Sequence, residues 1–199
     1  MLIVLRNIEN SHVLFFDAEY SEGFLIQFSG ILLKKIEENI FQISKSLNTY
    51  VKMPETVKVN NFIKNFTGIT DSYLETFGLS LEESKAIVEE LINIDEKDLL
   101  VVSHGLTNDR RVLLDNEINL YEDCNGNEIR GICTYNMAKR ILKREKRLKL
   151  EDIANESGLF ITNDHNAFTD AWATIAIFSF LCKKEEEGLN EKLLQSKRD

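Results

Sequence analysis

Short apolar runs and amphipathic segments alternate along this chain, and their order predicts strands first and helices later. Residues 13–16 form a short apolar run rich in aromatic and branched residues, which is typical of a buried strand. Segments 23–33 and 39–51 also have the composition of strands, and short turns separate the three. We therefore expect an antiparallel meander in the first quarter of the chain.

Helical patterns dominate the remainder. Segment 57–66 is a candidate short helix, and Ser80 with Glu83 three residues later matches a capping box that opens a longer one. In that longer helix, apolar residues recur at helical spacing at Ala86, Ile87, Leu91 and Ile94.

Two more buried strands are expected at 99–103 and 129–134, with the turn signal Asn125-Gly126 before the second. The remaining helices are expected at 108–115, 134–145, 150–157 and 166–184. A meander followed by strands that alternate with helices predicts an α/β fold, a mixed five-stranded sheet flanked by helices.

The composition indicates one globular domain. The chain has 199 residues, 43% of them hydrophobic, which suits a single core and excludes a disordered chain. We expect one domain over residues 1–185 and a charged tail over residues 186–199. No apolar run is long enough for a membrane span, and the N-terminus lacks the features of a signal peptide. The three widely spaced cysteines do not suggest disulfides, so the cytoplasm is the expected location.

Charge is unevenly distributed. The net charge of −9 counts against a nucleic-acid partner, because phosphate binding usually leaves a basic footprint. Between Lys139 and Lys149, however, seven cations face only one glutamate, Glu145. This basic stretch either contacts phosphates or is a solvated helix end whose cations complement the helix dipole.

Acidic residues stand at the ends of several predicted elements. Asp17 and Glu19 end the first strand of the meander, and residues two apart on a strand point to the same face. Asp109 follows the strand at 99–103, at a strand-to-helix junction where open α/β sheets present ligand-binding groups. Hard divalent cations such as Mg²⁺ prefer such carboxylate oxygens. Alternatively, Asp109 is a helix N-terminal acid and Asp17 and Glu19 lie in a polar turn.

A purely structural role is harder to assign to His165 and Asp170. They lie at the start of a helix that is otherwise almost wholly apolar, where a carboxylate needs a cation, a hydrogen-bond partner or water. An imidazole beside it can move a proton near neutral pH. The alternative is a capping aspartate with an incidental histidine.

Three segments of this sequence resemble the motifs of the DEDDh branch of the DnaQ-like 3′–5′ exonucleases. Phe15-Phe16-Asp17-Ala18-Glu19 is similar to their first motif, and Val102-Ser103-His104 through Asp109 to the second. His165-Asn166-Ala167-Phe168-Thr169-Asp170-Ala171 closely matches the third, His-x-Ala-x-x-Asp-Ala. Phe66-Thr67-Gly68-Ile69-Thr70 and Cys133-Thr134 resemble two further family segments.

The resemblance implies a ribonuclease-H-like fold and a two-metal active site. Asp17, Glu19, Asp109 and Asp170 would bind two Mg²⁺ or Mn²⁺ ions, and His165 would act as general base. Ala18, Tyr20, Ile69 and His104 would contact the substrate. Tyr20 stacks on a base or packs at a strand end, and Ile69 wedges between terminal bases or belongs to the core.

Several positions depart from the family pattern. The first motif usually continues with threonines and a glycine, where this chain has Tyr20-Ser21. Gly105 and Asn108 replace the usual Asn and Phe of the second motif, and Thr67 stands where a histidine is frequent. These changes bear on substrate preference and rate more than on metal chemistry.

The resemblance implies a 3′–5′ exonuclease that releases nucleoside 5′-monophosphates from single-stranded or 3′-ended nucleic acid, and we expect DNA. It would be a free nuclease or a proofreading subunit that docks on a DNA polymerase. The first alternative is a 3′–5′ exoribonuclease, which contacts with a 2′-hydroxyl would distinguish. The second is a non-catalytic nucleic-acid or partner-binding module on the same fold. No oligomeric state follows from the sequence.

Overall fold

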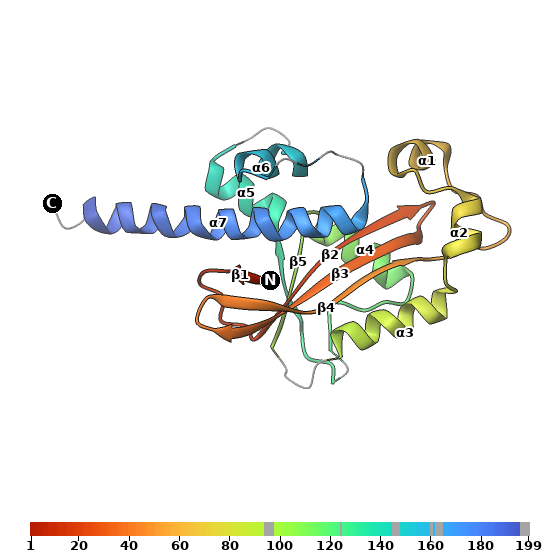
Figure 1. The fold of residues 1–199 in the computed structure, drawn as a ribbon, viewed down its shortest axis with the longest axis horizontal. Coiled ribbons are helices and arrows are strands. Elements are labelled where there is room, and N and C mark those ends of the chain that lie inside the picture. Colours follow the sequence, from red (N-terminus) through yellow and green to blue (C-terminus); the bar gives the residue numbers. More distant parts are fainter. Residues whose placement is uncertain (94–97, 124, 145–147, 160, 162–164, 196–199) are drawn as a thin grey trace.

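A single sheet with helices on both faces forms the body of the molecule (Figure 1). The computed structural model describes residues 1–93, 98–123, 125–144, 148–159, 161 and 165–195. The strands are β1 (Leu2–Val4), β2 (His12–Ser21), β3 (Phe24–Glu37), β4 (Ile40–Tyr50), β5 (Leu99–Ser103) and β6 (Arg130–Cys133). The helices are α1 (Asn61–Thr67), α2 (Asp71–Phe77), α3 (Leu81–Ile92), α4 (Leu106–Asp115), α5 (Thr134–Leu142), α6 (Leu150–Glu156) and α7 (Ala167–Gln195).

The sheet is mixed, with the strand order β1-β4-β3-β2-β5-β6. Strands β1 to β4 pair antiparallel, whereas β2, β5 and β6 run parallel to one another. The predicted α/β fold is confirmed, and each of the five predicted strands is present. The predicted number of strands is wrong, because the sheet has six. The additional strand, β1, has three residues, of which only Ile3 is buried. So short a strand has no readable periodicity, and its pairing with β4 defines it.

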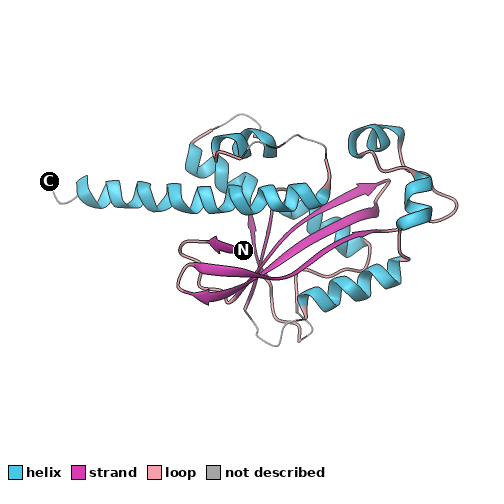
Figure 2. Ribbon diagram, viewed as in Figure 1, coloured by secondary structure: helices cyan, strands magenta, loops and turns pink. Residues whose placement is uncertain are grey.

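Alternate residues of β2 face different cores, which explains why the strand is apolar throughout. Val13 and Phe15 pack against α5, α6 and α7, whereas Leu14 and Phe16 pack on the side of α3 and α4. A strand covered on both faces has no polar side until it leaves the core. Figure 2 shows the resulting layers, with α7 lying across one face of the sheet.

Two helices in the first half of the chain differ from the expected pattern. Helix α1 begins at Asn61 rather than at residue 57, because Asn60 caps it and the chain before it is extended, with Val59 buried. Helix α2 was not predicted. The capping box of Ser80 and Glu83 is confirmed at the start of α3. Ile94, the last apolar residue expected in that helix, lies outside the described residues.

Helix α7 has 29 residues and continues to Gln195, well past the expected end at 184. It therefore crosses the expected boundary between domain and tail without a break, and a separate tail over residues 186–199 stays a prediction. None of the helices in the described part of the chain combines the length and apolar character that crossing a membrane requires.

Part of the basic stretch is used inside the protein. Arg140 pairs with Glu185 on α7, and Arg144 pairs with Glu156 at the end of α6. These ion pairs link the helices that cover one face of the sheet, which accounts for two of the seven cations. Glu145, Lys146 and Arg147 of this stretch lie outside the described residues, as does Cys124. Cys133 and Cys182 are free thiols.

Candidate active site

Three carboxylates converge where β2 leaves the core. Asp17 and Glu19 share the face of β2 that Val13 and Phe15 turn toward α7, and Asp170 lies in the first turn of α7. One oxygen from each of the three lies within 4.8 Å of the others. Among the described residues this is the one group of three or more acidic, histidine or cysteine side chains close enough to share a cation. The predicted face of Asp17 and Glu19 is thus the one that meets Asp170.

The start of α7 is anchored to the sheet by polar contacts. The Asn166 side chain accepts a hydrogen bond from the backbone N–H of Phe168 at 3.0 Å, as a helix N-cap does. The Ala167 N–H donates to Gln27 Oε1 at 3.3 Å, and Gln27 is fully buried on β3 directly opposite Glu19. Gln27 in turn donates to Asn48 Oδ1 at 2.9 Å. This network fixes where Asp170 enters the site.

Burial and mutual repulsion make these carboxylates reluctant to ionise. Burial, followed by the charges of Asp109, Glu19 and Asp170, raises the pKa of Asp17 well above its usual value. Burial and the charges of Asp170 and Asp109 raise the pKa of Glu19 to about 8. Such a group favours a proton or a cation among its oxygens. Oxygen donors at this density suit Mg²⁺ or Mn²⁺.

Asp109, the fourth predicted ligand, lies beside this group but is held by other partners. It is buried in the first turn of α4, and one of its carboxylate oxygens accepts a hydrogen bond from Ser103 Oγ. The Gly105 N–H donates to that same serine oxygen at 3.1 Å. Burial raises the pKa of Asp109, and the hydrogen bonds from Ser103 and Gly105 partly oppose this shift. Sequence reasoning missed Ser103, although the serine lies inside the second motif.

Gly105, one of the departures from the family pattern, lies against the Asp109 carboxylate. A Cβ at this position would lie 3.4 Å from Asp109 Oδ1 and 3.5 Å from Oδ2, which is ordinary van der Waals contact. The present orientation of Asp109 therefore does not by itself require a glycine here.

His104 is turned toward the start of α5. Its Nδ1 lies 2.9 Å from Thr134 Oγ1, and its ring meets Tyr135 edge-on. Burial lowers its pKa, so the neutral imidazole is favoured. A contact between His104 and substrate stays a prediction.

His165 precedes α7 with a left-handed backbone, at φ 45°. Its imidazole stacks face-to-face on Phe66 of α1, with ring centroids 3.3 Å apart and planes 19° apart. Phe66 in turn stacks with Phe62, at 5.4 Å and 20°. Sequence reasoning missed both phenylalanines; their spacing of four residues on a predicted helix was the available signal, because such residues share a face.

The other predicted substrate contacts differ in exposure. Tyr20 is 37% exposed beside the carboxylates, and burial followed by the charges of Asp109, Glu19 and Asp17 raises its pKa. Ala18 is buried on the opposite face of β2. Ile69 is also buried, in a small cluster with Ile26, Val59 and Leu74, which fits the interpretation of a core isoleucine. Substrate contacts of all three stay predictions.

Known nucleases share this architecture. The structure matches E. coli Exonuclease I in complex with a dT13 oligonucleotide with a TM-score of 0.71 and 18% identity, over 91% of this chain and 43% of that one. Exonuclease I from Methylocaldum szegediense matches with a TM-score of 0.67 and 20% identity, over 86% of this chain and 40% of that one. The nuclease domain of 3′hExo, a DEDDh family member bound to rAMP, matches with a TM-score of 0.63 and 16% identity, over 90% of this chain and 94% of that one. The chain thus spans less than half the length of the two Exonuclease I proteins.

The mixed sheet and its helices match the ribonuclease-H-like fold of these exonucleases. A family model described as Exonuclease matches residues 16–178, most of the chain. The chain belongs to this exonuclease family, the DEDDh or DnaQ-like 3′–5′ exonucleases that its motifs resemble. No curated protein matches the sequence.

Proposed function

We propose that the protein is a metal-dependent 3′–5′ exonuclease that releases nucleoside 5′-monophosphates from the 3′ ends of nucleic acid, with DNA as its substrate. The observation that carries this proposal is the meeting of Asp17, Glu19 and Asp170 within 4.8 Å, in a chain of the exonuclease family. The E. coli protein of similar fold binds a dT13 oligonucleotide, which supports a single DNA strand as the ligand.

Asp17, Glu19, Asp109 and Asp170 would hold two Mg²⁺ or Mn²⁺ ions. The raised pKa values of Asp17, Glu19 and Asp109 support this assignment, because buried carboxylates this close together favour cations. When bound, such ions polarise the scissile phosphate and acidify an attacking water. Ser103 would orient Asp109 for this role, since its hydrogen bond occupies one oxygen of a carboxylate that offers two.

His165 would accept the proton of the attacking water at its unprotonated ring nitrogen. Its position directly before α7 ties it to the helix that carries Asp170. The stack on Phe66 restrains the ring, so that the imidazole does not need to be ordered when substrate arrives. A base in this role typically contributes about 10²- to 10⁴-fold to the rate.

The decisive experiment is digestion of matched DNA and RNA oligonucleotides with Mg²⁺ or Mn²⁺, with chromatographic identification of the products. We expect stepwise shortening from the 3′ end, release of 5′-monophosphates, faster degradation of DNA and no activity in EDTA. His165→Ala should lose about 10²- to 10⁴-fold in rate, and Asp170→Asn should be inactive. Glu122→Gln, which alters an exposed acid elsewhere, is the matched control.

Other outcomes would contradict the proposal in defined ways. Full activity of both site variants would show that the assigned residues do not carry the reaction. Faster digestion of RNA would identify an exoribonuclease. Tight, salt-sensitive binding without metal-dependent turnover would identify a non-catalytic binding module.

A further inference from the structure

Helix α1 presents two phenylalanines to solvent beside the candidate active site. Phe62 is 67% exposed and Phe66 is 40% exposed. With His165 they form a row of three nearly parallel rings, which we call the Phe62–Phe66–His165 stack. Exposed phenylalanines gain little from folding, since most of their apolar surface remains in water.

The ring geometry favours a flat ligand. In the core, Phe15 and Phe178 meet edge-on at 63°, whereas the buried Phe16 and Phe28 are stacked at 23°. Phe62 and Phe66 are also stacked, at 20°, and so are Phe66 and His165, at 19°, but this row ends at a ring that is open to solvent. A row of parallel rings that ends in an exposed member can be extended by one more planar π-system, and nucleobases are such systems.

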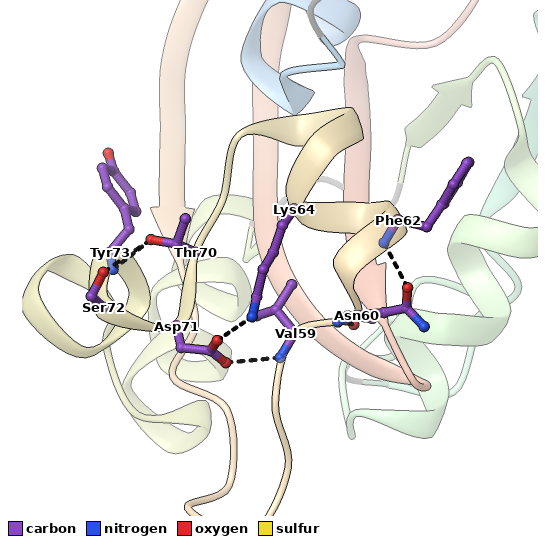
Figure 3. A network of polar contacts seen from close by, with 9 residues as sticks. Val59, Asn60, Phe62, Lys64, Thr70, Asp71, Ser72 and Tyr73 are labelled. Atoms are coloured by element: carbon purple, nitrogen blue, oxygen red, sulfur yellow. Dashed lines mark hydrogen bonds and ion pairs between the residues drawn. The ribbon is translucent and has the colours of Figure 1, made fainter.

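Polar contacts hold α1 firmly against its neighbours (Figure 3). Asp71 of α2 pairs with Lys64 at 2.6 Å and accepts from the Val59 N–H at 2.8 Å. The Asn60 side chain caps the helix through the Phe62 N–H, and the Phe62 ring points away from this network. The Asn60 N–H also donates to Ser21 Oγ at 2.9 Å, at the end of the strand that carries Asp17 and Glu19. The stack is therefore fixed relative to the carboxylates.

We propose that Phe62 stacks on an unpaired base of the substrate, upstream of the nucleotide that is removed. The strand would pass over α1 with its 3′ end at Asp17, Glu19 and Asp170. Bases of a duplex are stacked on their own neighbours, so only a single strand can offer a free face to Phe62 without unstacking. The stack would thus favour single-stranded ends. This inference rests on the proposed function, because it assigns a second subsite beside the same three carboxylates.

The test measures binding of a fluorescent oligothymidylate in the presence of Ca²⁺, with fluorescence anisotropy as the readout. Digestion in Mg²⁺ is measured separately. Stacking on an aromatic side chain contributes about 1–3 kcal/mol per base, so Phe62→Ala should raise Kd roughly fivefold or more. Phe62→Leu keeps an apolar side chain but no ring and should show a similar loss, whereas Phe62→Trp should restore binding. Phe77→Ala is the matched control, since Phe77 is 62% exposed on α2 and does not belong to the stack.

A second arm places one abasic site at successive positions of the oligonucleotide. The parent protein should lose affinity at one upstream position, and Phe62→Ala should no longer distinguish that position from its neighbours. Equal Kd values for the parent and Phe62→Ala, or for Phe62→Leu and Phe62→Trp, would overturn the inference while leaving digestion intact. Binding that depends on Phe62 in a protein that never digests the strand would overturn the proposed function instead.

Discussion

Acidic side chains gather at both ends of the central sheet, and the two groups differ in burial. At the C-terminal end of β2, Asp17, Glu19 and Asp170 are partly or fully buried within 4.8 Å of one another. Near the N-terminal ends of β5 and β6 lies a cavity of about 850 Å³, which we call the acidic cavity. Its acidic lining residues are Glu89, Glu90, Glu117, Glu122, Asp123 and Glu128.

The acidic cavity has more carboxylates, yet five of its six acids are exposed to solvent. Glu117 pairs with Lys85 at 3.2 Å, and the Asp123 side chain accepts hydrogen bonds from Asn125 and Asn127 within its own turn. Solvated carboxylates need no further counter-ion. At the site, by contrast, burial raises the pKa of Asp17 and Glu19. Proximity and burial, rather than the number of acids, therefore distinguish a metal site from an acidic surface.

The largest expected effect is on catalysis. Asp17→Asn should lower the rate of oligonucleotide digestion by more than about 100-fold, because residues that only support metal ligands already account for about 10- to 100-fold. Glu122→Gln in the acidic cavity should retain the parent rate. Single-turnover digestion of both variants at saturating Mn²⁺ checks this contrast. A comparable loss in Glu122→Gln would show that the acidic cavity also takes part.

Metal binding at Asp17, Glu19 and Asp170 should stabilise the folded protein, whereas the acidic cavity should contribute no such stabilisation. A cation at a hundred times its Kd adds about 2.7 kcal/mol to the free energy of unfolding, or a rise in Tm of about 5–10 °C for a chain of this size. This rise, measured by thermal unfolding with and without Mn²⁺, should disappear in Asp17→Asn. It should persist in Glu122→Gln; if it vanished there, the stabilising cation would bind in the acidic cavity.

A smaller effect is expected from the group that holds Asp109. Ser103→Ala removes the hydrogen bond to the Asp109 carboxylate and should lower kcat about tenfold, the range typical of residues that orient metal ligands. Ser84→Ala is the matched control, because Ser84 is also fully buried but lies on α3, which carries none of the candidate site residues. Equal rates for the two variants would leave Ser103 without a part in catalysis.

The smallest effect is the pH dependence of the metal-free protein. The raised pKa of Glu19, about 8, means that folding favours its protonated form. This contribution to stability is fully present below the pKa of the unfolded chain and is lost as the pH rises through 8. In EDTA, Tm should therefore fall by a few degrees between about pH 5 and 8, and less in Glu19→Gln. An identical slope in parent and variant would contradict the assigned burial of Glu19.

The sequence predicts the acidic group well because its signals are local. Asp17 and Glu19 follow from the two-residue period of a strand, and Asp170 from an acid in an apolar helix. The same holds for the capping box of α3 and for the five longer strands. In each case the residues that carry the signal lie within one short segment of the chain.

What the sequence could not predict depends on contacts between distant segments. The stack of His165 on Phe66 requires a left-handed backbone at His165 and the contact of α1 with the chain just before α7. The hydrogen bond from Ser103 to Asp109 depends on how α4 leaves β5. Strand β1 exists only through its pairing with β4. None of these has a period or a composition that marks it in the chain.

The hydrogen bond between Ala167 and Gln27 joins residues 140 positions apart, and Asp17 and Asp170 are farther apart still. Contacts of such long range carry a loop-closure entropy cost that local contacts do not. A growing chain must therefore be made at least as far as Asp170 before that carboxylate can meet Asp17 and Glu19. Until α7 docks, the acidic group consists only of the carboxylates that β2 carries, and the three-carboxylate arrangement does not yet exist.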